Sequence, residues 1–214
     1  MTKPIIIGVT QRVDFIEPYN ETRDSLDENL INWLKGVDCI PVPIPNTLIN
    51  ISANDKVPDF SQLNRWIRSI GIQGFVLSGG NDIGDCVYRD ETERYLLDLA
   101  KRESLPVLGL CRGMQMMGTW AGGKLVESPS HVGVRHTLHS ASSAKEWKRS
   151  VNSFHNFSFK ICPDEFSVLA KSTDGCLEAM RHNVLPWEAW MWHPERDKVF
   201  SEFDYQRIQS LFDI

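Results

Sequence analysis

The stretch Pro106-Val-Leu-Gly-Leu-Cys-Arg-Gly-Met-Gln-Met-Met117 decides the predicted fold. Residues 107–110 form a short apolar run, which is typical of a buried parallel strand. Cys111 follows this run directly, with a glycine two residues away on each side, and residues 114–120 have the composition of a buried helix. A strand, a Gly-x-Cys-x-Gly turn and a helix form the thiol version of a nucleophile elbow. The chain is therefore predicted to be organised around a sharp turn at Cys111.

Two interpretations of Cys111 compete at this point. A thiol at a helix N-terminus is favoured as the thiolate by the helix dipole, and the flanking glycines let neighbouring backbone approach it closely. The alternative is a buried cysteine that packs as a small hydrophobic side chain, which is the commoner role of a free cysteine. Other parts of the sequence have to decide between them.

The first half of the chain predicts an α/β arrangement. Apolar strands are expected at residues 4–10 and 39–44, at the run that begins at Gly74, and at residues 107–110. Helices are expected at residues 25–36, 60–69 and 89–103. This alternating order predicts a parallel sheet with helices on both faces. Residues 11–21 are polar and are predicted to form a loop at the carboxyl edge of that sheet.

The second half is predicted to be richer in β-structure. The candidate strands lie close together, which predicts hairpins that extend the sheet, at residues 124–126, 132–139, 156–161, 166–172, 176–181 and 187–192. Residues 204–212 are expected to form a final helix. There is no internal repeat, low-complexity segment or composition change, so residues 1–214 are predicted to form a single domain.

Composition excludes several classes of function. The 214 residues are 42% hydrophobic and 24% charged with a net charge of −5, and no basic block predicts nucleic-acid binding. No apolar stretch approaches the roughly 18 residues of a membrane span, and the chain begins with a predicted strand, so a cytoplasmic location is expected. Five widely spaced cysteines without a Cys-x-x-Cys pair argue against disulfides and a structural zinc site. No metal or cofactor is indicated.

A second constellation is Trp192-His193-Pro194-Glu195. The proline disfavours helical geometry at His193, which is therefore expected to be extended. In an extended segment, residues two apart project to the same side, so Glu195 could orient the His193 imidazole. With Cys111, this makes a nucleophile, a base and a group that holds the base. An isolated His-Pro-Glu sequence would equally suit a solvated surface.

Acyl transfer also requires donors for the oxyanion of the tetrahedral intermediate. One donor is expected to be the backbone N–H of Arg112, which follows the nucleophile, and the other that of Gly80 in the Ser78-Gly-Gly-Asn-Asp82 loop. Each such donor is worth about 3 kcal/mol of transition-state stabilisation. A nucleotide-phosphate loop is the weaker interpretation of these glycines, because the Gly-x-Gly-x-x-Gly and Walker patterns are absent.

The third stretch is Ser150-Val-Asn152-Ser153-Phe154-His155. Its polar residues around an aromatic residue, after a predicted loop, would suit recognition of a polar substrate end through backbone groups. The segment could instead be a simple turn before the next strand.

Together these four motifs resemble class I glutamine amidotransferase-like proteins. The chain has Cys111-Arg-Gly-x-Gln115, Ser78-Gly-Gly-x-Asp-Ile83, Val151-Asn-Ser-x-His155 and Trp192-His-Pro-Glu195 in the order typical of that family. The forms of the cysteine motif and the glycine loop look most like the γ-glutamyl hydrolase branch, peptidase family C26, which includes hydrolases of γ-glutamyl-γ-aminobutyrate. The resemblance covers nearly the whole chain.

The resemblance implies a flavodoxin-like three-layer sandwich with a mostly parallel sheet, to which the hairpin-rich second half is added. It also implies a γ-glutamyl thioester on Cys111 that water hydrolyses, with His193 and Glu195 completing the triad and Gly80 and Arg112 forming the oxyanion hole. Positions that hold the γ-glutamyl group in the family correspond to Gln115, Asn152, Ser153 and Phe154. The role of His155 is left open.

The chain also departs from the family pattern. It is short for a γ-glutamyl-γ-aminobutyrate hydrolase, the loop after Asp82 is trimmed, and Met191 replaces the usual glutamine. These differences concern the leaving-group side of the site rather than the glutamyl side.

Three functions follow from these observations. The leading hypothesis is a stand-alone γ-glutamyl amide hydrolase acting on a small-molecule γ-glutamyl substrate. The second is a glutaminase subunit that passes ammonia to a separate synthetase, although no sequence feature indicates a synthetase partner or a homo-oligomer. The third is a non-catalytic binding or redox-sensing protein, and the presence of Cys111, His193 and Glu195 together argues against it.

Overall fold

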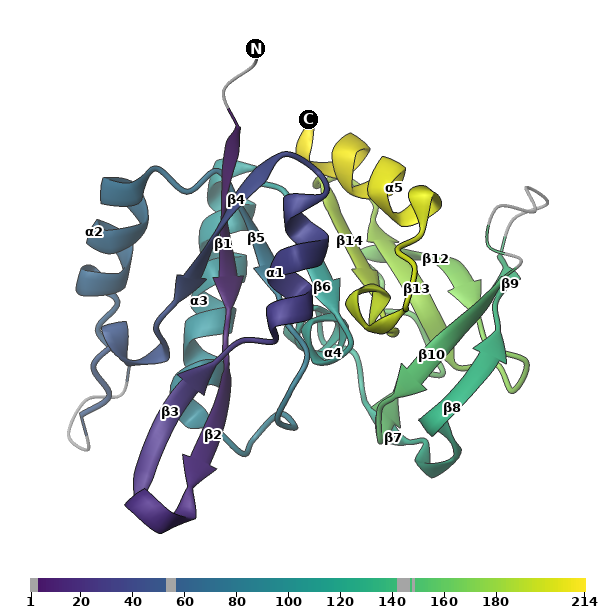
Figure 1. Cartoon of the computed structure of the whole chain (residues 1–214), viewed down its shortest axis with the longest axis horizontal. Helices are drawn as coiled ribbons and strands as arrows, with labels where there is room; N and C mark the ends of the chain where they lie inside the picture. Colours follow the sequence, from purple (N-terminus) through teal and green to yellow (C-terminus); the bar gives the residue numbers. More distant parts are fainter. Residues whose placement is uncertain (1–3, 53–56, 142–146, 148) are drawn as a thin grey trace.

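A mixed eight-stranded sheet forms the centre of the computed structural model, which describes residues 4–52, 57–141, 147 and 149–214 (Figure 1). Five strands are parallel, in the order β4 (Cys39–Ile44), β1 (Ile5–Thr10), β5 (Gly74–Leu77), β6 (Val107–Leu110) and β14 (Trp187–Trp190). Three antiparallel strands continue the sheet, namely β13 (Leu177–His182), β12 (Phe166–Lys171) and β9 (His139–Ser140). The predicted fold class, a mostly parallel central sheet in an α/β protein, is confirmed.

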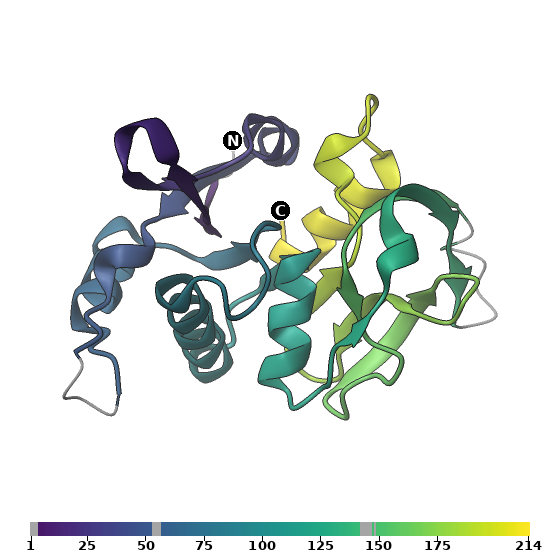
Figure 2. The same cartoon turned by 90° about the horizontal axis from the view of Figure 1, so that it is seen from below.

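Helices cover both faces of the sheet and bury two separate hydrophobic clusters. Helices α2 (Ser61–Ile70), α3 (Val87–Glu103) and α4 (Arg112–Trp120) pack against one face, and α1 (Glu28–Lys35) and α5 (Glu202–Phe212) against the other. Figure 2 shows α1 on the opposite side of the sheet from α3 and α4. Strand β5 serves both clusters, because Phe75 and Leu77 point to one face and Val76 to the other.

The prediction of a loop at residues 11–21 is wrong. Strands β2 (Arg12–Ile16) and β3 (Glu21–Ser25) form an antiparallel hairpin around the short 3₁₀ helix η1 (Glu17–Tyr19), and the hairpin projects from the end of β1 (Figure 1). The sequence signal was weak because no residue of either strand is buried. A strand without a buried face lacks the alternation of apolar and polar residues by which strands are recognised.

The hairpin-rich second half was predicted only in part. Strands β12, β13 and β14 extend the main sheet as expected, but β8 (Val132–Thr137) and β10 (Ser150–Phe154) form a separate two-stranded sheet, as do β7 (Val126–Glu127) and β11 (Phe157–Ser158). The 150–154 segment is thus a strand, not a turn. The described residues also include three further 3₁₀ helices: η2 (Asn46–Leu48), η3 (Pro129–His131) and η5 (Pro194–Arg196).

The order of the strands places the ends of β1, β5 and β6 at one edge. The chain moves outward from β1 to β4 and then returns to β5 on the other side of β1. In open α/β sheets, ligands bind outside the carboxyl ends of strands at such a reversal. Cys111 follows β6 at this edge. Within the described ranges, no helix combines the length and the apolar character needed to cross a bilayer.

Candidate active site

Cys111 occupies a strained turn between β6 and α4. Its backbone has φ 50° and ψ −105°, a conformation that costs a non-glycine residue about 1–3 kcal/mol. The turn is held by its N–H, which donates to Trp190 O at 2.7 Å. A side chain at Gly113 would collide with the Leu77 backbone, and one at Gly109 would lie 2.8 Å from the Gly113 carbonyl carbon. The flanking glycines therefore allow the turn to pack against β5, as expected of a nucleophile elbow.

His193 and Glu195 are in direct contact. His193 Nδ1 lies 2.6 Å from Glu195 Oε1, and both side chains are buried. The prediction that the whole segment is extended is wrong, because residues 194–196 form the 3₁₀ helix η5 and only His193 before it is non-helical. A proline at the first position suits a helical turn, and such a turn can also bring residues two apart together. The carboxylate is thus positioned to hold the imidazole.

The His193 imidazole also interacts with the Cys111 thiol. Burial alone would lower the pKa of His193, but hydrogen bonding and charge interaction with Cys111, together with Glu195, outweigh burial and raise the pKa to about 10. His193 is therefore protonated at neutral pH, beside a sulfur and a carboxylate that both favour its charge. This arrangement suits an imidazole that exchanges protons with a neighbouring nucleophile and leaving group.

The glycine loop after β5 packs directly against His193. A side chain at Gly79 would collide with the His193 ring, so only glycine fits there. Gly80 has φ +135°, a conformation that L residues rarely adopt. Arg112 is the first residue of α4, where backbone N–H groups have no partner inside the helix. The oxyanion hole formed by Gly80 and Arg112 stays a prediction, but both residues lie beside the catalytic candidates.

Asn152 holds the backbone of His193. Its Nδ2 donates to His193 O at 2.7 Å, and its Oδ1 accepts from His193 N–H at 3.0 Å. Its Nδ2 also lies 3.2 Å from Asp197 Oδ1. The side-chain amide predicted to contact substrate is thus occupied in fixing the segment that carries the imidazole, a role that the local sequence did not reveal.

The other predicted substrate contacts differ in their surroundings. Gln115 is buried and donates from Nε2 to Phe157 O at 2.9 Å, which ties α4 to β11. Ser153 Oγ donates to His131 O at 2.6 Å. Phe154 is exposed, its ring lies edge-on to His193 at 6.0 Å, and the Arg196 guanidinium stacks on it at 4.8 Å. Their contacts with a substrate remain predictions.

A network of buried ion pairs connects the turn at Cys111 to α3 and to the loop after β5, and the sequence analysis did not predict it. The Arg112 guanidinium pairs with Glu93 and Asp90 of α3. Glu93 also accepts from Arg89 Nε at 3.1 Å, and Arg89 Nη2 donates to Ser78 O at 2.8 Å and Gly79 O at 3.0 Å. The network thus connects the loop after β5 to the first turn of α4. The i, i+4 spacing of Arg89 and Glu93 was the only local signal.

The β2–β3 hairpin is fastened to the same loop. Asn81 Oδ1 accepts from Val13 N–H and Asn81 Nδ2 donates to Val13 O, both at 2.8 Å. This places Arg12 next to Gly80, and a pocket beside His193 is lined by Arg12, Arg196 and the two glycines, among other residues. The hairpin therefore places a guanidinium, paired with Asp14 at 2.8 Å, at the edge of the site.

Comparisons with known proteins agree with this architecture. The sequence model of the Peptidase C26 family matches residues 5–195, and the chain belongs to that family. The family and the relatives below make it a cysteine-type amidohydrolase of the γ-glutamyl hydrolase and glutamine amidotransferase kind.

Two curated relatives show how the chain compares with individual proteins. It is 28% identical over 205 residues to the "Gamma-glutamyl-CDP-amidate hydrolase" of Campylobacter jejuni, covering 90% of this chain and 91% of the relative. It is also 28% identical over 158 residues to a subunit of the glutamine-hydrolysing GMP synthase of Methanocaldococcus jannaschii, covering 71% and 80%.

A solved structure matches the whole fold. The crystal structure of a putative GMP synthase subunit from Thermoplasma acidophilum superimposes with a TM-score of 0.71 at 18% identity, covering all of this chain and 94% of that one. At this identity the match concerns the fold alone.

Proposed function

We propose that the protein hydrolyses a γ-glutamyl amide through a thioester on Cys111. The observation that carries this proposal is one buried imidazole, that of His193, which contacts the Glu195 carboxylate at 2.6 Å and whose pKa is raised by Cys111 and Glu195. The strained turn at Cys111 presents the thiol at the carboxyl edge of the sheet, where a substrate can be bound.

The reaction follows from the protonation state of His193. The Cys111 thiolate attacks the γ-carbonyl carbon, and the N–H groups of Gly80 and Arg112 stabilise the resulting oxyanion. The C–N bond then breaks as the His193 imidazolium gives its proton to the leaving nitrogen. Water attacks the thioester, His193 takes the water proton, and glutamate leaves as the thiolate is restored. Glu195 keeps the imidazole oriented throughout.

We propose γ-glutamyl-CDP-amidate as the substrate, with release of glutamate and cytidine diphosphoramidate for capsular polysaccharide biosynthesis. Support comes from the relative in C. jejuni, which matches along nearly the whole chain. The two arginines beside His193 add a second reason, because guanidinium groups suit the phosphate oxygens of such a leaving group.

Removing these arginines tests the leaving group. Arg12→Ala and Arg196→Ala should each raise KM for γ-glutamyl-CDP-amidate roughly tenfold or more, because each removes a charge-assisted contact, while KM for glutamine changes little. The measurement is glutamate release from both substrates, with γ-glutamyl-γ-aminobutyrate as a third. Arg23→Ala is the matched control, since Arg23 lies on the same hairpin and pairs with Glu21. An equal increase of KM for all three substrates would count against an anionic leaving group.

The second candidate function is a glutaminase subunit that delivers ammonia to a separate synthetase. The GMP synthase subunit of M. jannaschii, whose similarity covers 80% of that relative, is the observation that favours it. Glutamine hydrolysis that is slow in the isolated protein and stimulated by a synthetase would support this alternative.

The pH dependence tests the role of Glu195. Because the pKa of His193 is raised, the protonated form stabilises the folded protein fully below about pH 6.5, and this contribution is lost as pH rises through about 10. The decrease of kcat/KM at alkaline pH, its alkaline limb, should follow the same titration of His193. Glu195→Gln removes one of the charges that raise this pKa and should move the limb to lower pH by about one unit or more. An unmoved limb would show that Glu195 does not act on His193.

A further inference from the structure

A buried cluster of ionisable side chains lies outside the proposed catalytic residues. His131 ends η3, His155 follows β10 and Glu178 lies on β13, and they are 4%, 2% and 0% exposed. The three residues come from segments well separated in the sequence. No step of the proposed reaction uses them.

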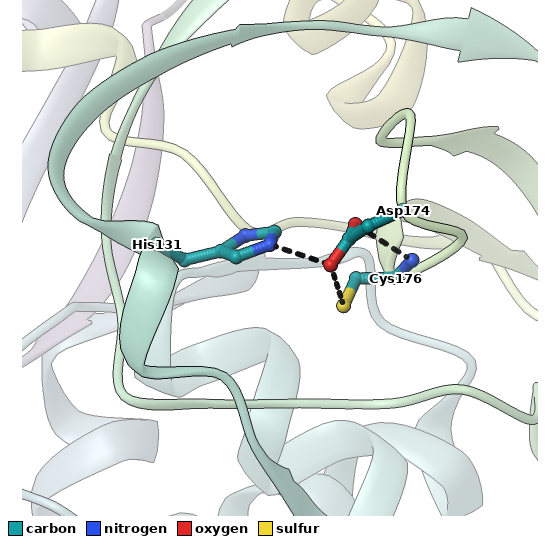
Figure 3. Close-up of side chains that lie close together, drawn as sticks. All are labelled: His131, Asp174 and Cys176. Carbon is teal, nitrogen blue, oxygen red and sulfur yellow. Dashed lines mark hydrogen bonds and ion pairs between the residues drawn. The ribbon is translucent and has the colours of Figure 1, made fainter.

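Hydrogen bonds determine which nitrogen of each histidine carries a proton. His131 Nε2 lies 3.1 Å from Asp174 Oδ2 and must donate to it, and Figure 3 shows the Asp174 carboxylate between the His131 ring and Cys176. His155 Nδ1 lies 3.0 Å from the Phe157 carbonyl oxygen and must donate to that. In neutral rings, the opposite nitrogens therefore carry lone pairs.

These lone pairs converge on one point together with a carboxylate. His131 Nδ1 and His155 Nε2 lie 3.2 Å apart, and Glu178 Oε1 lies 3.5 Å from the first and 3.7 Å from the second. Among the described residues, neither carboxylate oxygen of Glu178 has a partner with hydrogen-bond geometry, although a third histidine, His136, places its Nε2 3.1 Å from Oε1. Three buried electron-pair donors facing one another are unfavourable unless a proton or a metal cation lies between them.

The spacing of the three donor atoms fits a metal ion. Atoms separated by 3.2, 3.5 and 3.7 Å lie on a circle with a radius of about 2.0 Å, which is the length of a zinc–nitrogen or zinc–carboxylate bond. Both histidines also donate their other ring N–H, one to a carboxylate and one to a backbone carbonyl. Metal-ligating histidines almost always have such partners, which fix the tautomer and the ring orientation.

We propose that His131 Nδ1, His155 Nε2 and Glu178 bind one divalent transition-metal ion, of which zinc fits best. Two histidines and one glutamate are a known zinc donor set, and the fourth position is open to water or to His136 Nε2, which lies 3.1 Å from Glu178 Oε1. Because the ligands are buried, the ion is structural: it joins η3, the end of β10 and β13. Ser153 on β10 already donates to His131 O, so the ion stabilises the strand from which Asn152 holds His193.

The neighbouring group around Asp174 is not the site. Asp174 Oδ1 accepts from Ser172 Oγ at 2.5 Å, and Oδ2 accepts from His131 and lies 3.5 Å from the Lys160 ammonium. Its oxygens are therefore supplied with donors and a positive charge. The unpartnered Glu178 carboxylate lies on the other side of the His131 ring, and the ion belongs there.

Metal titration of the full-length protein tests the proposal. A Cys111→Ala background removes the thiol beside His193 as a competing zinc ligand. After removal of metal with a chelator, calorimetry with Zn²⁺ should show one equivalent bound, and Zn²⁺ should raise the melting temperature. Co²⁺ should give visible absorption typical of nitrogen and oxygen ligands without a thiolate charge-transfer band, which would also exclude Cys176 as a ligand.

Substitutions locate the ion. Glu178→Gln and His155→Gln should lose stoichiometric binding, while Asp174→Asn, which changes only the partner of His131, should weaken Kd about 10–100-fold. His139→Gln is the matched control, because His139 is exposed and its Nε2 lies 3.1 Å from Thr173 Oγ1. Circular dichroism shows whether each variant folds. Zinc binding that survives loss of Glu178, or no equivalent of zinc or cobalt in the unsubstituted cluster, would overturn the proposal and leave a shared proton between the rings.

Discussion

Replacing Cys111 by alanine is expected to reduce glutamate release from γ-glutamyl amides by about ten-thousand-fold or more. Without the thiol no thioester can form, and the oxyanion donors and the imidazole cannot replace the covalent step. Two measurements check this result: initial rates of glutamate release, and mass spectrometry of protein quenched during turnover. The unsubstituted protein should carry one glutamyl group on the Cys111 peptide, and the variant should carry none.

Two other cysteines, Cys39 and Cys162, provide the control. Burial, as the largest cause, raises the pKa of Cys39 and of Cys162 to about 11, so both thiols are protonated at neutral pH. Only the thiolate is an effective nucleophile. Iodoacetamide should therefore alkylate Cys111 well before these two, and Cys162→Ala should keep full activity. Turnover retained by Cys111→Ala would remove the basis of the proposed mechanism.

Replacing Glu93 by alanine is expected to lower the free energy of unfolding by about 3–5 kcal/mol. Glu93 is fully buried and pairs with the guanidinium groups of both Arg89 and Arg112. Its removal would leave two buried cations with too little compensation. Urea unfolding followed by circular dichroism measures the change, and activity should fall with it, because Arg112 begins the helix behind Cys111.

The matched control is Glu91→Ala, two residues away on the same helix. Glu91 pairs with Arg94 at 2.6 Å on the solvent-accessible side, and such pairs contribute about 0–1 kcal/mol. If Glu93→Ala lowers the free energy of unfolding no more than Glu91→Ala does, the network does not stabilise the fold.

Acid should weaken the same network. Burial would raise the pKa of Glu93, but the charges of Arg112 and Arg89 outweigh burial and lower it. The carboxylate therefore contributes stability above the ordinary glutamate pKa of about 4.3, and this contribution is lost as pH falls through the lowered value. The difference in the free energy of unfolding between the unsubstituted protein and Glu93→Ala should therefore become smaller as the pH is lowered.

The buried strands and helices of the first half of the chain were predicted well from the sequence, whereas the buried strand at residues 150–154 was not. The strands at residues 39–44 and 107–110 were predicted with the observed bounds, because both are short, mostly apolar runs between clear breaks. The hairpin at residues 12–25 was not predicted, because its strands are not buried and their sequences show no alternation of apolar and polar residues. In the first half of the chain, a buried face therefore made an element easier to predict from the sequence.

The local sequence was sufficient to predict those features in which the interacting groups are close together in the chain. The turn at Cys111 follows from its two glycines, and the contact of His193 with Glu195 spans only two residues. These features, with the order of the motifs, predicted the family and the class of chemistry. Their energetic basis is short-range sterics and hydrogen bonding, which adjacent residues determine.

Features that join distant segments depended on the folded chain. Asn152 holds the His193 backbone across 41 residues, and the Glu93 carboxylate meets Arg112 across 19. The meeting of His131, His155 and Glu178 likewise brings three separate elements to one buried point. Polar groups can be buried only with partners, and which partners are available is set by the packing of the sheet and its helices rather than by any local pattern.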